Sequence, residues 1–378
     1  MSIRQPARDN RQVKTLRLPV DPGHLDHADA RQAIARAADL LRCGKLVALP
    51  TETVYGLGAN ALDAAAVARI FEAKQRPSWD PIIVHIAGPV TNNPMPGTSM
   101  LDEPMLAALV VDVPQAARKL MQAFWPGPLT LLLPRSAAVP DIVTAGRSLV
   151  GIRMPAHPVA FQLIQTAGIP IAAPSANIFG HISPTTADHV LDDLDGRIDA
   201  VLDAGPTQHG VESTVLDPNQ TPMILYRPGA ITAEQLRAVA GPVEIFHAPP
   251  RDESRPQDAL PSPGVGLRHY APRARLILLE VSLRELAPHV AVQLQQHQAE
   301  RVGVMLPAEI PAAEIAQRFP NAVIFPWGRW ALPQELAHAL YAGLRTLDAE
   351  GCAIILCPLP PADGLGAALH DRLRKAAR

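Results

Sequence analysis

The sequence predicts an α/β protein built in two parts, and two patterns lead to this prediction. Beyond residue 274, apolar strand-like runs alternate with helix-like segments through short connections, which is typical of a small, doubly wound parallel sheet. Before residue 247, short apolar runs alternate less regularly with amphipathic segments, and they predict a larger sheet with flanking helices. The length of 378 residues is ample for two hydrophobic cores.

Several helix ends in the first part are marked by residues with known end preferences. Gly44 and Gly168 are expected to end helices because glycine readily adopts positive φ. Asp63 is expected to cap a helix, and Pro114 to open one. We expect helices at residues 26–43, 63–73, 114–124, 158–167 and 232–240, and strands at 46–49, 82–86, 148–153, 169–173, 200–203, 213–217, 223–226 and 243–246, with one more in LTLLLP.

The second part, from residue 274 to residue 378, has the more regular pattern. Strands are expected at 276–281, 302–306, 323–325 and 353–356, and helices near 283–298, 312–319, 334–349 and 365–377.

Three other segments have no such pattern. Residues 1–25 are polar and basic, and we expect a loose tail there. Residues 88–113 contain many turn-forming residues without periodicity, which predicts a loop-like insertion with no assigned role. Residues 247–273 are rich in Pro, Asp, Arg and Ser and predict an exposed linker.

The composition narrows the possible functions. Lys and Arg number 34 against 36 for Asp and Glu, and aromatic residues make up only 4%. Neither the global charge nor the stacking capacity therefore favours nucleic-acid binding, although a local basic patch is compatible with it. The three cysteines form neither a disulfide framework nor a zinc-ligand pattern, which fits a reducing cytoplasm. We expect no signal peptide and no membrane span, because no apolar run is long enough.

The segment LPTETVYGLGANA, residues 49–61, is the most informative local motif. It places Thr51, Glu52, Thr53 and Tyr55 directly after an apolar strand, at the sheet edge where α/β proteins bind ligands. The alternative interpretation of the whole segment, its glycines included, is an ordinary turn. Its glycines formally match a dinucleotide-binding fingerprint, but polar residues separate the first glycine from the strand, so we reject this interpretation. The sequence also has no phosphate-binding P-loop, no nucleophile elbow and no H-E-x-x-H motif.

Cations follow other predicted strands and helices. Lys74 and Arg76 lie at a helix end, where they could bind a phosphate or merely favour the helix dipole. Arg153 and Arg227 end strands, and Arg153 needs a carboxylate or phosphate partner, which could also be a structural salt bridge. His85, inside an apolar strand, is on its own more often a core residue than a ligand.

Small polar side chains follow the same elements. Ser175 and Asn177 come after a very apolar strand, Ser183 precedes an expected helix N-cap, and Ser213 opens another strand. Together with the arginines, this set suits a polyanionic nucleotide and a small zwitterion. No general base or nucleophile is evident, so we expect catalysis by positioning and charge neutralisation, as in phosphoryl and nucleotidyl transfer.

These motifs carry a family likeness. PTETVYGLG, KQRP, IIVHI, FWPGPLT, VGIRMPAHP, PSAN, SPT, GVESTV and YRPG, spanning about residues 46–231, closely resemble the threonylcarbamoyl-AMP synthases, the YrdC-like family. SPGVGLRHYAP and the C-terminal TLDAEGCAIILCPLP and LHDRLRKAA resemble its longer, two-domain branch. The resemblance implies a YrdC-like catalytic domain at residues 26–246 with a twisted mixed sheet, a linker that acts as a lid at 247–273, and a Rossmann-like domain at 274–378.

The resemblance also implies an activity and site residues. The family forms threonylcarbamoyl-AMP and pyrophosphate from L-threonine, bicarbonate or CO₂, and ATP, and the product feeds the tRNA threonylcarbamoyl transferase machinery. The implied threonine contacts are Thr53, His85, Arg153, Ser175 and Ser213. The implied ATP contacts are Arg76, Asp80, Asn177, Ser183, Arg227, Tyr270 of the lid and the backbone at Leu149, with Lys74 and Arg76 as the catalytic cations. Mg²⁺ would arrive with ATP, since no dedicated metal site is evident.

One residue departs from the family pattern, and two rival functions are compatible with parts of the sequence. Asp80 stands where the family usually has Asn, and an acidic group near ATP needs Mg²⁺ or Lys74 to offset it. One rival, the related carbamoyl-transfer enzyme of hydrogenase maturation, should bring cysteine-rich zinc motifs that this chain lacks. The other is a YrdC-like protein without synthase activity that binds tRNA or double-stranded RNA.

Overall fold

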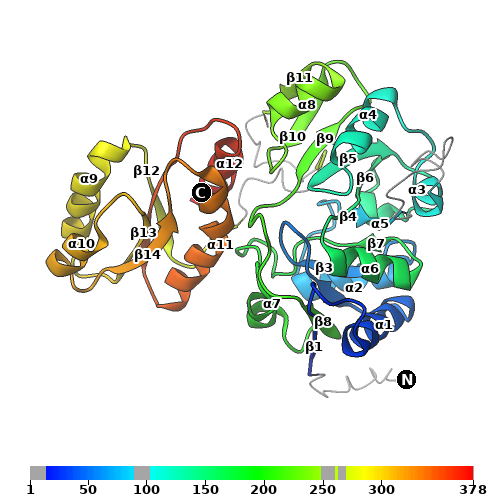
Figure 1. Cartoon of the computed structure of the whole chain (residues 1–378), viewed down its shortest axis with the longest axis horizontal. Coiled ribbons are helices and arrows are strands. Elements are labelled where there is room, and N and C mark those ends of the chain that lie inside the picture. Colours follow the sequence, from blue (N-terminus) through cyan, green and yellow to red (C-terminus); the bar gives the residue numbers. More distant parts are fainter. Residues whose placement is uncertain (1–13, 89–102, 248–259, 263–269, 378) are drawn as a thin grey trace, which may run out of the picture.

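The computed structural model describes residues 14–88, 103–247, 260–262 and 270–377 (Figure 1). Most of the predicted tail, residues 89–102 of the predicted insertion, and linker residues 248–259 and 263–269 lie outside the described residues. The described chain forms two sheets, each covered by helices (Figure 1). Within those ranges, no helix combines the length and the apolar character that a bilayer crossing requires.

The larger sheet is mixed, and its strands follow the order β1-β8-β2-β3-β7-β4-β6-β5-β9-β10-β11. Parallel pairs such as β4 with β6 alternate with antiparallel pairs such as β5 with β6. The strands are β1 (Leu16–Pro19), β2 (Val47–Leu49), β3 (Gly56–Asn60), β4 (Ile83–His85), β5 (Leu129–Pro134), β6 (Leu149–Arg153), β7 (Ile171–Ala172), β8 (Ala200–Asp203), β9 (Thr214–Asp217), β10 (Met223–Arg227) and β11 (Val243–Ile245). This confirms the mixed sheet that the family resemblance implied.

Helices cover both faces of this sheet, because its strands alternate apolar side chains between two cores. Val47 and Leu49 of β2 pack with α1 (Ala28–Arg42) and α6 (Pro158–Ala167) in one core, whereas Ala48 belongs to the other. The second core includes residues of α2 (Ala64–Lys74), α3 (Pro104–Leu109), α4 (Gln115–Phe124), α5 (Asp141–Thr144), α7 (Ala187–Leu194) and α8 (Ala233–Ala240).

The helix ends follow the expected local chemistry. The Asp63 carboxylate accepts hydrogen bonds from the backbone N–H groups of Ala65 and Ala66 and so caps α2. Gly168 ends α6 in the left-handed conformation, with φ 66°. The predicted helix ends at these positions are confirmed.

The smaller sheet is entirely parallel, with the order β12-β15-β13-β14. Its strands are β12 (Arg275–Leu279), β13 (Val302–Pro307), β14 (Val323–Gly328) and β15 (Ile354–Pro358). Helices α9 (Leu283–Gln296) and α10 (Ala312–Arg318) pack on one face, and α11 (Pro333–Ala349) and α12 (Gly366–Ala376) on the other. The predicted doubly wound parallel sheet is confirmed.

Three local predictions need correction. Residues 16–19, predicted to be part of a loose tail, form β1, which pairs with β8 in parallel. Residues 104–109, predicted to belong to a loop-like insertion, form α3, whose N-terminus is capped by the Glu103 carboxylate. Residues 56–60 are strand β3 rather than part of a turn. Each is too short, or too rich in glycine, to show periodicity, and tertiary packing decides its structure.

Helices α11 and α12 face the larger sheet (Figure 1). The core between them and the smaller sheet also contains Val54, Ile182 and Val211, which lie in connections of the larger sheet. The side of the smaller sheet that carries α11 and α12 is thus packed against the loops that follow β2, β7 and β8.

Gly58 of β3 leads to a stability prediction. A Cβ atom there would lie 2.9 Å from Leu49 Cδ2 and 3.0 Å from both Ile171 Cγ2 and the Val47 carbonyl oxygen. Replacing Gly58 with Ala should therefore lower the free energy of unfolding by about 1–3 kcal/mol through overpacking, as measured by urea denaturation.

Gly151→Ala is the matched control, since Gly151 is also a strand glycine and its Cβ would meet neighbours at ordinary distances of 3.4–3.6 Å. Equal stability losses in the two variants would contradict overpacking as the cause.

Candidate active site

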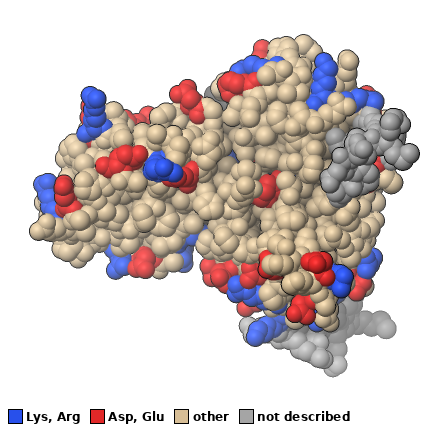
Figure 2. All heavy atoms as spheres, viewed as in Figure 1, with Lys and Arg blue, Asp and Glu red and all other residues tan. Residues whose placement is uncertain are grey.

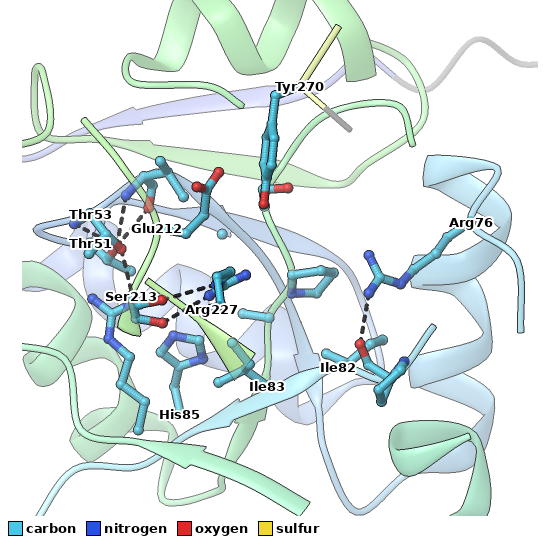
Figure 3. Close-up of a pocket in the computed structure, with 17 residues that line it drawn as sticks. Thr51, Thr53, Arg76, Ile82, Ile83, His85, Glu212, Ser213, Arg227 and Tyr270 are labelled. Atoms are coloured by element: carbon cyan, nitrogen blue, oxygen red, sulfur yellow. Dashed lines mark hydrogen bonds between the residues drawn. The ribbon is translucent and has the colours of Figure 1, made fainter. Parts of the chain in front are cut away.

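A pocket lies at the carboxyl ends of strands of the larger sheet (Figure 3). His85 and Arg153 are neighbours in register at the ends of the parallel strands β4 and β6, and Arg227 ends β10. The loops after β2 and β7 and the segment before β9 contribute further residues to the lining. Of the predicted site residues, Thr53, Arg76, His85, Arg153, Ser175, Ser213, Arg227 and Tyr270 line this one pocket.

On one side of the pocket, Arg153 is held by two residues of the TETV segment. Its Nη2 atom lies 2.7 Å from the Glu52 carboxylate, and its Nη1 atom donates to Thr53 Oγ1 at 2.9 Å. All three side chains are buried. Burial alone would raise the pKa of Glu52, but the charge of Arg153 and the hydrogen bonds that the carboxylate accepts from Arg153 and from the backbone together outweigh burial and lower that pKa. Sequence reasoning placed Glu52 at the ligand-binding edge of the sheet but gave it no role, because an acidic residue in a polar turn gives no signal of a partner so far along the chain.

His85 lies beside this pair and is buried. Burial, and then the nearby charge of Arg153, lower the pKa of His85 to about 3. The imidazole is therefore neutral at physiological pH, and it can accept or donate a hydrogen bond in the pocket without adding charge.

Arg227 and Ser213 form a second group. The Arg227 Nε atom donates to the Ser213 carbonyl oxygen at 3.0 Å, and Nη2 contacts the Ser213 hydroxyl at 3.1 Å (Figure 3). The same hydroxyl is 2.8 Å from Thr130 Oγ1. The guanidinium plane of Arg227 is thereby fixed at the pocket wall.

Arg76 forms the opposite side of the pocket (Figure 3). It is paired with Asp80 at 2.9 Å, donates to the Asp80 and Pro81 carbonyl oxygens, and lies over the Phe179 ring at 5.8 Å. The acidic residue that the sequence placed next to ATP is therefore neutralised by Arg76 rather than by Lys74. Asp80 itself is buried behind the arginine and does not line the pocket.

Tyr270 and Glu212 close the remaining side, where the Tyr270 ring points toward the Glu212 carboxylate (Figure 3). Tyr270 is buried, has φ 66° and stacks on Tyr341 with ring centroids 5.7 Å apart. The next residue, Ala271, donates its N–H to the Gly180 carbonyl. The described end of the predicted lid is thus fixed against the pocket. Glu212 lines the pocket, although sequence reasoning gave it no role.

The other predicted site residues do not line this pocket. The Lys74 ammonium is fully buried and donates to the carbonyl oxygens of Ser175 and Asn177 at 2.6 and 2.5 Å. Burial, and then the neighbouring Arg76, lower its pKa well below the ordinary value. The Ser183 hydroxyl donates to Glu212 at 2.6 Å, and Leu149 packs beside Ile83 and Tyr226.

These residues support the lining rather than form it. Lys74 fixes the loop that carries Ser175, and Ser183 helps to hold Glu212. Within the described ranges, no group of three or more His, Cys, Asp or Glu side chains is placed to hold a metal ion.

A mixed α/β sheet with arginines and small hydroxyl groups gathered at its strand ends is typical of α/β enzymes that bind anionic ligands. A family model described as "Telomere recombination" matches residues 39–229, and one described as "Threonylcarbamoyl-AMP synthase, C-terminal domain" matches residues 231–378.

Curated relatives extend over nearly the whole chain. Threonylcarbamoyl-AMP synthase of Bacillus subtilis is 44% identical over 91% of this chain and 92% of its own length. That of Pyrococcus abyssi is 41% identical over 90% and 93%. The crystal structure of P. abyssi Sua5 complexed with L-threonine has a TM-score of 0.82 and 39% identity, and covers 96% of this chain and 98% of its own. The chain belongs to the threonylcarbamoyl-AMP synthase family and is an enzyme of this kind.

His85 leads to a pH prediction. The unfolded chain takes up a proton at the ordinary histidine pKa of about 6.5, whereas folded His85 stays neutral down to about pH 3. Lowering the pH from about 7.5 to about 5 therefore favours unfolding by about 2 kcal/mol through this residue. A His85→Gln variant should lose about 2 kcal/mol less of its free energy of unfolding than the wild type over the same interval.

The exposed His24 provides the control, as His24→Gln. Identical pH dependence in the wild type and in His85→Gln would contradict the buried, neutral state of His85.

Proposed function

We propose that this protein forms threonylcarbamoyl-AMP and pyrophosphate from L-threonine, bicarbonate or CO₂, and ATP. One observation carries the proposal: a single pocket has two chemically different sides. Hydroxyl groups and an imidazole surround Arg153 on one side, and the cations Arg76 and Arg227 lie on the other. A small zwitterion suits the first side, and a nucleotide polyphosphate suits the second. Relatives named threonylcarbamoyl-AMP synthase support the assignment.

We assign threonine to the side formed by Thr53, His85, Arg153, Ser175 and Ser213. Arg153 is the group to meet the amino acid's carboxylate, because its guanidinium is already oriented by Glu52 and Thr53. Its pairing with Glu52 makes it a neutral unit, so specificity for a carboxylate depends on hydrogen-bond geometry rather than on free positive charge. The P. abyssi structure complexed with L-threonine supports threonine as a ligand of this protein by similarity.

We assign MgATP to the side formed by Arg76, Arg227 and Tyr270. Four other residues that were expected to contact the nucleotide do not line the pocket, and we propose that they hold the residues that do: Asp80, Leu149, Asn177 and Ser183. Lys74, expected from sequence to be a catalytic cation, is better placed to hold the Ser175 loop through its two carbonyl contacts. Arg76 is the cation that we propose for the phosphates.

The chemistry requires little from the protein beyond positioning. The threonine amine attacks CO₂, a C–N bond forms and a proton is released, giving N-carboxythreonine. A carboxylate oxygen of this carbamate attacks the α-phosphorus of MgATP, the bond from that phosphorus to the bridging oxygen breaks, and pyrophosphate leaves. Arg76 and Arg227 stabilise the charge that shifts to the phosphate oxygens.

The product would be consumed by the tRNA threonylcarbamoyl transferase machinery, and we place the reaction in the cytoplasm, where three free cysteines are stable. A direct contact with tRNA or double-stranded RNA is the weaker proposal. On the face drawn in Figure 2, the described Lys and Arg side chains lie dispersed among Asp and Glu, unlike the clustered cations typical of nucleic-acid binding.

Arg76→Ala tests the function most simply. Removing this cation should lower threonine- and bicarbonate-dependent pyrophosphate release by at least about a hundredfold, with threonylcarbamoyl-AMP followed by mass spectrometry. Arg36→Ala is the control, because Arg36 is an exposed arginine on α1.

Wild-type enzyme that makes no threonylcarbamoyl-AMP from MgATP, threonine and bicarbonate would overturn the proposed function. Full activity in Arg76→Ala would overturn only the role of this arginine.

A further inference from the structure

Glu212 lines the pocket and is almost completely buried, which is unusual for a carboxylate. It is 6% exposed. Its Oε1 atom accepts hydrogen bonds from the Ser183 hydroxyl at 2.6 Å and the Tyr341 hydroxyl at 3.0 Å, and its Oε2 atom accepts from Arg372 Nε at 2.7 Å. Burial alone would raise the pKa of Glu212, but Arg372 and Arg227 outweigh it and lower that pKa to about 2.

Two of these partners belong to helices that pack on the smaller sheet. Tyr341 lies on α11 and Arg372 on α12, the helices that face the larger sheet (Figure 1). Both are fully buried. The smaller sheet therefore supplies the cation and one of the hydroxyls that compensate a carboxylate in the pocket wall.

Arg372 also holds a second pocket segment. Its Nη1 atom donates to the Pro228 carbonyl oxygen at 2.9 Å, and Pro228 directly follows Arg227. Ser213, which accepts from Arg227, directly follows Glu212. One guanidinium thus bridges the two backbone segments that carry Arg227 and Ser213. Gly229 allows these segments to approach, since a Cβ there would lie 2.4 Å from the Thr214 nitrogen.

Tyr270 is part of the same cluster. The Arg372 guanidinium lies over the Tyr270 ring at 5.4 Å, and Tyr270 stacks on Tyr341. The residue expected to close over the nucleotide is therefore seated on the two side chains that hold Glu212.

We infer that Arg372, with Tyr341, is a positioning residue for the ATP side of the pocket, acting through Glu212 and Pro228 on Ser213, Arg227 and Tyr270. The inference rests on the proposed function for the identity of the ligand, although the positioning itself does not. In this way the smaller sheet neutralises a carboxylate that would otherwise lie uncompensated beside the phosphates.

Loss of Arg372 would leave the buried Glu212 carboxylate without the cation that is paired with it. A buried carboxylate without a cation is strongly unfavourable, and the segment that carries it must shift toward water. Such a shift would move the Ser213 carbonyl that orients Arg227. Arg153, which is held by Glu52 and Thr53 instead, should be unaffected.

The test uses four variants of the full chain. Tyr341→Phe removes one hydrogen bond while keeping the ring. Arg372→Lys keeps the charge but loses the fork that spans Glu212 and Pro228. The double variant Glu212→Gln with Arg372→Met removes both charges, so that a folded protein can be compared even if a single charge deletion does not fold. Arg345→Met is the control, because Arg345 joins α11 to Asp193 and is not part of the pocket lining.

Two measurements distinguish a positioning role of Arg372 and Tyr341 in the pocket from a role only in holding the two sheets together. Amide hydrogen exchange over residues 212–215 and 227–231 should quicken by about tenfold in Tyr341→Phe and in the double variant, but not in Arg345→Met. Calorimetric titration with MgATP should show binding weakened by about fivefold in Tyr341→Phe, more in the double variant, and restored in part in Arg372→Lys relative to the double variant. Threonine binding should weaken less than MgATP binding in every variant other than the control, because Ser213 is the only assigned threonine contact that lies in the loosened segments.

The outcomes distinguish the two proposals. Unchanged exchange in the folded variants overturns the positioning role whether or not ATP binds. Equal weakening of threonine and MgATP binding also overturns it, because that pattern indicates general loosening. Wild-type protein that binds no MgATP overturns the proposed function, and the exchange measurement then still decides the positioning role.

Discussion

Glu212 places a carboxylate where the two sheets meet, and charge compensation in that dry environment constrains much of the surrounding structure. Water is excluded by α11, α12 and the wall of the pocket, so side chains must supply the hydrogen bonds and the positive charge. Arg372 supplies the charge and at the same time fixes Pro228. The contact between Arg372 and Glu212 therefore both holds the smaller sheet against the larger one and fixes the shape of the pocket.

The same rule organises the rest of the pocket. Arg153 is paired with Glu52, Arg76 with Asp80, and Arg227 is oriented by Ser213. An array of unpaired buried arginines would be costly, whereas paired or hydrogen-bonded guanidinium groups remain charged and are fixed in orientation before a ligand arrives. Preorganisation of this kind is what nucleotidyl transfer requires of a protein, since the reaction depends on positioning and charge stabilisation more than on a protein nucleophile.

The sequence could predict those features of the fold and the site that are determined by residues close together in the chain. Asp63 and Gly168 mark helix ends by their own chemistry, and the strand–helix alternation beyond residue 274 was enough for the smaller sheet. Strand β1 could not be predicted, because its few residues are stabilised by β8, far along the chain. The pairing of Glu52 with Arg153 and of Glu212 with Arg372 could not be predicted for the same reason, since Glu212 and Arg372 are 160 residues apart. Lys74 was recognised as important, but only the structure could place its ammonium on backbone carbonyls.

Glu212 and Arg372 should be energetically coupled across the two sheets, and a double-mutant cycle in urea denaturation measures this coupling. We expect Glu212→Gln and Arg372→Met each to lower the free energy of unfolding. The double variant should lose less than the sum of the two, with a coupling of about 2 kcal/mol or more. Losses that add within about 0.5 kcal/mol would contradict this coupling.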